Sequence, residues 1–170
     1  MQVRRSTAML AGMLLLAVPV TASCGMSGLD AATNRDYTPA AGANDRDASV
    51  DVLGAVVVSA QKGSGTFLAT FVNNDTTEDA TVTGIGSAAG GTDLTVGDFA
   101  PITVPARGMD NLAGEGKAGI PVSGDFEAGD FLAMQITLGT GETVDMKVPV
   151  VPDDEQFDNE FQGLDTSGES

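Results

Sequence analysis

The sequence predicts an all-β fold, an immunoglobulin- or cupredoxin-like β-sandwich, for residues 48–152. Three observations support this prediction. Short β-branched or alternating segments recur along this stretch, and turns rich in glycine, asparagine and aspartate separate them. No window beyond the N-terminal apolar stretch has a convincing helical period. Short strands at such regular spacing are typical of a sandwich.

Eight segments have the composition of strands. The first is a long β-branched run. The second places Phe67, Ala69 and Phe71 on one face, because successive side chains of a strand alternate, and it ends at the turn residue Asn73. Pro121 cannot donate to a ladder, so its segment is predicted to be an edge strand. The eight segments are residues 50–58, 66–72, 80–85, 94–96, 102–104, 118–122, 131–138 and 142–150.

The last two segments show the clearest pattern. Large apolar residues alternate with small or polar ones through both residues 131–138 and residues 142–150, and Gly139-Thr140-Gly141 lies between them. This predicts a hairpin with one face in the core and one face in water. Met134 and Met146 fall on the core face, so we expect them to fill space there rather than bind a metal.

A lipoprotein signal peptide is predicted at the N-terminus. Arg4 and Arg5 precede an apolar stretch, residues 8–18, and small residues lead to Cys24, the only cysteine. The apolar stretch is shorter than the roughly 20 residues of a membrane span. We expect residues 1–23 to be removed and Cys24 to carry a diacylglycerol anchor on the outer face of the cell membrane. A threonine stands where leucine usually precedes such a cysteine, so ordinary cleavage with a free thiol stays open.

The two ends of the mature chain lack the composition of a folded domain. Residues 24–47 have almost no large apolar side chain, which predicts a lipidated N-terminus and flexible tether. Residues 153–170 hold seven acidic residues and no basic one, which predicts an acidic disordered tail. Phe157 and Phe161 lie four positions apart there and could form a transient helical face.

The charge limits the classes of partner. Removal of residues 1–23 takes away two arginines and no acidic residue, so six basic and 24 acidic residues remain and the net charge is −18. Such a surface repels nucleic acid and anionic lipid, so neither is expected as a direct ligand. One cysteine excludes an internal disulfide. Abundant alanine, glycine, valine and aspartate with little lysine favour a high-GC Gram-positive bacterium as the source.

The order of segments resembles the periplasmic copper-chaperone (PCuAC-like) family over about residues 53–151. Gly65-Thr66-Phe67-Leu68-Ala69-Thr70-Phe71-Val72-Asn73-Asn74 resembles the family's "aGYlTltN" strand. Ile102-Thr103-Val104-Pro105-Ala106-Arg107-Gly108 resembles "leVPAgg", and Phe126-Glu127-Ala128-Gly129-Asp130 resembles "LkeGD" ahead of the final hairpin. The resemblance implies a small cupredoxin-like sandwich.

The resemblance also implies a Cu(I) site of two histidines and methionines, but this chain contains no histidine. Where the family's two ligand groups are expected, it has residues 90–96 and 117–121, which contain none of these ligands. We therefore predict no metal ligand, cofactor-binding residue or catalytic residue. Met109 is the methionine expected to be exposed, in a turn at 107–110, whereas Met26 belongs to the tether.

Three further segments contain residues found in cation, phosphate or catalytic sites, but their patterns favour turns. Residues 44–47 and 73–75 are rich in oxygen ligands but lack the spacing of a calcium loop. Residues 114–117 are similar to a phosphate loop, but alanine follows where serine or threonine is needed, so a flexible hairpin loop is predicted. The three carboxylates of residues 125–130 lie between glycines, which indicates a solvated turn.

The function predicted from these observations is a lipid-anchored, extracytoplasmic, copper-chaperone-like sandwich that serves as a non-enzymatic binding or envelope-interaction module. Without histidine, no Ser-His or Cys-His nucleophile pair can form. The expected partners are the membrane, through Cys24, and an unidentified envelope protein. Two alternatives stay open: a metallochaperone that uses Met109 and carboxylates, and a carboxylate-dependent hydrolase with two carboxylates converging in a cleft.

Overall fold

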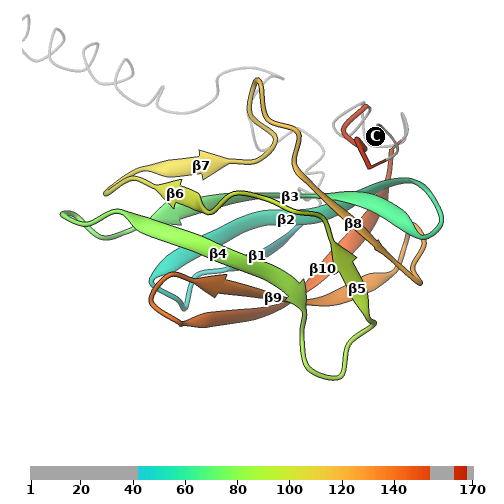
Figure 1. Cartoon of the computed structure of the whole chain (residues 1–170), viewed down its shortest axis with the longest axis horizontal. Helices are drawn as coiled ribbons and strands as arrows, with labels where there is room; N and C mark the ends of the chain where they lie inside the picture. Colours follow the sequence, from blue (N-terminus) through green and yellow to red (C-terminus); the bar gives the residue numbers. More distant parts are fainter. Residues whose placement is uncertain (1–41, 154–162, 168–170) are drawn as a thin grey trace, which may run out of the picture. The chain divides into compact units, whose positions relative to one another are not determined.

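The computed structural model describes residues 42–153 and 163–167, and all regular structure in them is β-strand (Figure 1). The predicted all-β class is therefore confirmed. The predicted signal peptide, Cys24, Met26, Phe157 and Phe161 lie outside the described residues. The strands are β1 (Ala43–Asp45), β2 (Val50–Gln61), β3 (Ser64–Asn73), β4 (Ala80–Ser87), β5 (Leu94–Val96), β6 (Ile102–Val104), β7 (Met109–Asn111), β8 (Ile120–Gly124), β9 (Phe131–Leu138) and β10 (Thr143–Pro152).

These strands form one sheet in the order β5-β8-β3-β2-β10-β9-β4-β6, with β1 added to β2 and β7 to β3. β10 joins its two halves: residues 143–149 pair antiparallel with β9, and residues 150–152 pair parallel with β2. The sheet curls so that the halves face each other across one core, as in the predicted sandwich (Figure 1). It is closed on the side of β10 and open on the side where β5 and β6 end the sheet.

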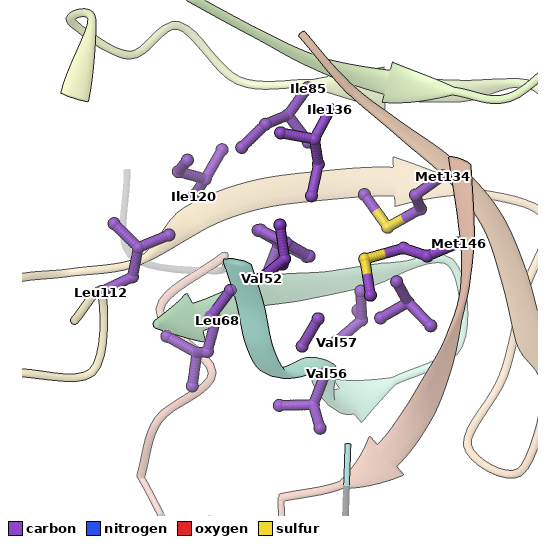
Figure 2. Close-up of a cluster of buried hydrophobic side chains, with 14 of the residues drawn as sticks. Val52, Val56, Val57, Leu68, Ile85, Leu112, Ile120, Met134, Ile136 and Met146 are labelled. Carbon is purple, nitrogen blue, oxygen red and sulfur yellow. The ribbon is translucent and has the colours of Figure 1, made fainter. Parts of the chain in front are cut away.

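The core is apolar and draws side chains from both halves of the sheet (Figure 2). β9 and β10 alternate between buried and more exposed residues, as predicted. Met134 and Met146 lie opposite each other in the hairpin, and their side chains are directed toward one another in Figure 2. They are 0% and 9% exposed. Burying a side chain of this size contributes about 1.5–3 kcal/mol, so both act as core residues.

The folded domain begins earlier than predicted. β1 lies inside the segment predicted to be tether, and it pairs with β2. Asn44 Oδ1 accepts a hydrogen bond of 2.8 Å from the backbone N–H of Gly54. Gly54 has a φ of 61°, and the register between β2 and β3 shifts at this point. A side-chain amide that completes a bulge leaves no hydrophobic pattern, so composition alone could not indicate β1.

The prediction that Pro121 marks an edge strand is wrong, because β8 lies between β3 and β5. β5 is only three residues long, and its pairs with β8 begin at Val122. The carbonyl of Pro121 accepts a hydrogen bond from Gly97 N, just past the end of β5. The N–H and C=O groups of a strand residue point to the same side. The N–H that proline lacks would therefore have pointed toward Gly97, beyond the last residue of β5. The proline therefore costs no strand hydrogen bond.

Residues 163–167 depart from the predicted disorder of the acidic tail. The carboxylate of Asp165 accepts hydrogen bonds from Ala60 N (2.8 Å) and from the hydroxyl of Thr66 (3.2 Å). Leu164 packs against the core. Specific polar contacts and one apolar side chain hold the segment, and an acidic composition does not reveal contacts of this kind.

Candidate functional site

A pocket of about 350 Å³ opens on the side of the sandwich where β5 and β6 end the sheet. Its walls come from the β5–β6 connection, from β7 and from the chain that leads into β8. Most of the lining is apolar, and one acidic and one basic side chain complete it. The lining residues are Phe99, Ala100, Pro101, Ile102, Asp110, Leu112, Lys117, Ala118, Gly119 and Ile120. This volume lies within the range of small-molecule sites.

One wall of the pocket is a loop that interrupts a strand. β7 and β8 both pair antiparallel with β3: Asn111 lies opposite Thr70, and Ile120 lies opposite Phe67. Thr70 and Phe67 are three positions apart on β3, whereas their partners Asn111 and Ile120 are nine positions apart in the sequence. The excess chain, residues 113–119, leaves the sheet, and we call it the pocket loop. A hairpin loop was predicted here, and that prediction is wrong because β7 and β8 pair with β3 rather than with each other.

Two local contacts hold the pocket loop near the sheet. Lys117 Nζ forms an ion pair with Asp110 Oδ1, and the two side chains are 42% and 17% exposed. A partly exposed pair of this kind contributes only about 0–1 kcal/mol. Gly119 has a φ of 64°, and a Cβ built there would lie 2.4 Å from Cγ2 of Thr66. Only glycine allows the chain to pass so close to β3.

The fold brings together the two segments where the family resemblance expects copper ligands. β5 ends the first and β8 begins in the second, and these strands pair, with Val96 opposite Val122. Residues 117–120 line the pocket. Neither segment supplies a histidine, methionine or cysteine. Within residues 42–153 and 163–167, no group of three or more His, Cys, Asp or Glu side chains could hold a metal ion.

The methionines lie as the alternation predicted. Met134 and Met146 are buried in the core, so the core assignment is confirmed. Met109 is 67% exposed, also as predicted, although it begins the strand β7 rather than lying in a turn. The next residue, Asp110, lines the pocket and pairs with Lys117. Soft thioethers suit Cu(I), but one exposed thioether is not a site.

Of the two clusters of oxygen ligands, residues 73–75 serve in a turn as predicted, whereas Asn44 and Asp45 of the other cluster belong to β1. Asp45 Oδ1 accepts a hydrogen bond from Asp47 N. Asp75 Oδ1 accepts hydrogen bonds from Thr77 N, Thr77 Oγ1 and Glu78 N. The backbone N–H groups of Thr77 and Glu78 are the main reason that the pKa of Asp75 is lowered from its usual 3.8. Asp75 thus stabilises the β3–β4 turn, and its Oδ1 already has three partners.

The carboxylates of residues 125–130 also lie in a turn. Glu127 N donates to Asp130 Oδ2 at 2.9 Å, and Asp130 N donates to the Glu127 carbonyl at 3.1 Å. Asp125 and Lys62 are 3.8 Å apart with both side chains largely in solvent. A second pocket, about 210 Å³ between β2 and β4, contains one carboxylate, Asp79, which accepts a hydrogen bond from Ala106 N. In neither of these two pockets do two carboxylates converge.

The sequence pattern did not indicate the large apolar residues Phe99 and Leu112 of the pocket. Phe99 and Leu112 are large apolar residues in connections without a strand pattern, and Phe99 is only partly buried. Their size and their position between short strands were the only features in the sequence that could have indicated a pocket. These features are weak indications, because single apolar residues in connections are common on protein surfaces.

No family model matches the sequence, and no curated protein matches it. Among solved structures, the copper-bound PCuAC domain from PmoF2 matches with a TM-score of 0.52 and 10% identity, over 65% of this chain and 98% of that one. The apo PCuAC domain from PmoF1 matches with a TM-score of 0.50 and 16% identity, over 65% of this chain and 99% of that one. This chain has a PCuAC-like fold. The resemblance seen in the sequence is thereby confirmed at the level of the fold.

Within this PCuAC-like fold, no sequence segment supplies the ligands that the family resemblance implies. Apolar residues and an Asp–Lys pair line the pocket, and the segments expected to hold copper ligands contain none. The described part of the chain contains no helix of the length and apolar character needed to cross a membrane. The predicted lipid attachment at Cys24 falls outside the described residues and stays a prediction.

Proposed function

We propose that this protein is a non-enzymatic, copper-chaperone-like binding module, held on the outer face of the cell membrane by a lipid on Cys24. The observation that carries the proposal is the apolar pocket beside the pocket loop. The loop runs into one of the two segments where the PCuAC resemblance expects copper ligands. Aliphatic side chains and the aromatic ring of Phe99 line the pocket, so it suits an apolar group better than a metal ion.

The chemistry of the lining defines the class of ligand. Phe99, Ile102 and Leu112 can cover an apolar group, and each Å² of apolar surface removed from water contributes about 25 cal/mol. Lys117 and Asp110 place a donor and an acceptor at the same pocket. The expected ligand is therefore a small apolar group, free or presented by an envelope component, with a polar atom that can reach this pair.

The anchor follows from the sequence around Cys24. A lipid at this residue would leave residues 25–41 as a link to β1, with no large aromatic residue except Tyr37. A diacylglycerol group supplies the two acyl chains that stable anchoring requires. The strongly acidic surface would hold the domain away from anionic lipid, so that the pocket faces other envelope components.

Titration of the mature chain, as its Cys24→Ser variant, with 8-anilinonaphthalene-1-sulfonate tests the proposal. We expect a saturable rise in fluorescence at one dye per domain. Ala100→Gln should weaken it, because Ala100 is an exposed residue that lines the pocket. Ala128→Gln is the matched control, since Ala128 is exposed on the β8–β9 turn. An absent rise, or equal binding by both variants, would overturn the proposal.

A second function is favoured by the exposure of Met109 next to Asp110. A metallochaperone could bind Cu(I) through this thioether and nearby carboxylates. Cu(I) titration against a competing chelator, again with Cys24→Ser, distinguishes the two functions. Tight binding of one Cu(I) per chain that is lost in Met109→Leu would replace the binding-module proposal. A carboxylate-dependent hydrolase has no comparable support, because the carboxylates of residues 125–130 lie in a solvated turn.

A further inference from the structure

We propose that residues 163–167 form a clasp that sets the position of the pocket loop, so that the shape of the pocket depends on the C-terminal segment. Thr166 is the positioning residue, because it contacts both the sheet and the loop. The inference concerns the geometry of the pocket, and it holds whether or not the pocket binds the apolar group proposed above.

The first set of contacts that hold the clasp involves Asp153, at the end of β10. Asp153 directly follows β10, and its backbone N–H donates to the Ser59 carbonyl of β2 at 3.2 Å. Its carboxylate accepts hydrogen bonds from Gly163 N at 2.5 Å and from Asp165 N at 3.1 Å. The segment that follows residues 154–162 in the sequence is thereby held beside the end of β10.

Asp165 binds β2 just past the end of its pairing with β10, and it also binds β3. The last parallel pair between β10 and β2 is Pro152 with Ser59, and the next N–H of β2, that of Ala60, donates to Asp165 Oδ2 at 2.8 Å. Asp165 Oδ1 accepts hydrogen bonds from the Thr66 hydroxyl (3.2 Å) and from the backbone and hydroxyl of Ser167 (3.0 and 2.6 Å). A carboxylate with this many donors has one well-defined position.

Thr166 connects the clasp to the pocket. Its backbone N–H donates to Thr66 Oγ1 at 2.8 Å, and Thr66 is completely buried in β3. Its hydroxyl donates to the carbonyl of Ala118 at 2.8 Å. Ala118 belongs to the pocket loop and lines the pocket. One residue therefore bridges the sheet, through its backbone, and the loop, through its side chain.

The pocket loop depends on this bridge because its own pairing with β3 is interrupted. Leu112 N donates to the Ala69 carbonyl before the loop, and pairing resumes at Ile120. Between them, Lys117 N donates to the carbonyl of Gly114 within the loop, and Lys117 Nζ pairs with Asp110. Beside the partly exposed Lys117–Asp110 pair, the Thr166 hydroxyl thus ties the returning arm of the loop to the rest of the domain.

Hydrogen exchange of the full mature chain, in a Cys24→Ser background, tests the clasp. Thr166→Val keeps the size and the backbone N–H but removes the hydroxyl. We expect amides of residues 112–119 to exchange about threefold to tenfold faster, as follows from the loss of one hydrogen bond. Thr166→Ser should restore the wild-type rate. Thr83→Val is the matched control, because it removes a hydroxyl that donates to the Thr137 carbonyl away from the pocket.

Exchange in β9 and β10 should not change in Thr166→Val, which separates a local effect from general destabilisation. Unchanged exchange in the pocket loop, an equal acceleration there in Thr83→Val, or an acceleration across the whole domain would overturn the clasp. The dye titration tests the proposed function, whereas hydrogen exchange in the pocket loop tests the clasp. Either proposal can therefore be refuted without the other.

Discussion

Gly119→Ala should destabilise the domain more than Gly116→Ala, although both glycines lie in the pocket loop with left-handed backbone. Their φ angles are 64° and 77°. Alanine costs about 1–2 kcal/mol in this conformation at either position. At Gly116 an added Cβ meets nothing within 4 Å. At Gly119 it would lie 2.4 Å from Cγ2 of Thr66 and 2.7 Å from Cδ2 of Leu68.

The difference between the two variants can be estimated from these contacts. Both atoms lie in the well-packed strand β3, where Thr66 and Leu68 are 0% and 5% exposed, so neither can move away freely. Overpacking of this kind adds about 1–3 kcal/mol to the backbone cost. Gly119→Ala should therefore cost roughly 2–5 kcal/mol in total, and Gly116→Ala roughly 1–2 kcal/mol.

Thermal unfolding followed by circular dichroism measures the difference. For a domain of about this size, 1 kcal/mol corresponds to roughly 4 °C in Tm, so Gly119→Ala should melt about 8–20 °C below wild type and Gly116→Ala about 4–8 °C below. Both variants should retain the β spectrum at 25 °C. Equal losses of Tm would show that the pocket loop does not pass against β3 at Gly119, and would refute the description of the pocket wall.

Four further outcomes are expected. Met134→Ala and Met146→Ala should each lower the free energy of unfolding by about 2–4 kcal/mol in urea, because both side chains are buried; neutral substitutions would contradict their assignment to the core. Cys24→Ala should move the protein from the detergent phase to the aqueous phase, and continued membrane partitioning would disprove lipidation. Cu(I) should leave the Tm of the mature Cys24→Ser chain unchanged under reducing conditions, whereas a saturable rise at one copper per chain that Met109→Leu removes would favour the metallochaperone. Burial raises the pKa of Asp165, but hydrogen bonds from the surrounding donors outweigh it and the pKa lies below its usual 3.8. Its stabilisation should therefore be complete above the unfolded pKa and disappear as the pH falls through the lower folded value, so wild type and Asp165→Asn should differ at neutral pH and converge in acid.

The final hairpin was predictable because its two faces have different surroundings. β9 spans the residues predicted, and β10 begins one residue later than predicted. Each has one face in the core and one face more exposed, so the two-residue period is visible in the sequence. The same reasoning placed Met134 and Met146 in the core without any knowledge of the rest of the fold.

The pocket and the clasp could not be predicted in the same way, because both depend on contacts between distant residues. β7 and β8 both pair with β3, and the sequence of residues 109–124 contains no local pattern that indicates this shared partner. The contact between Thr166 and Ala118 spans 48 residues and involves a backbone carbonyl, which every residue possesses. Polar contacts of this kind produce no periodic pattern in the sequence. Pro121 was misleading because β5 is too short to pair with it, so β8 can hold a proline without being an edge strand.

The parallel pairing of β2 with β10 has a consequence for how the chain reaches its native state. Val57 and Val150 are partners although 93 residues separate them, so the early strand cannot complete its pairing until the last strand is available. Contacts of such long range slow folding, because the entropy of loop closure must be lost before the contacts form. A nascent chain that ends before β10 leaves one edge of β2 open, and an open edge can pair with another chain. The domain should therefore fold only after its synthesis is nearly complete.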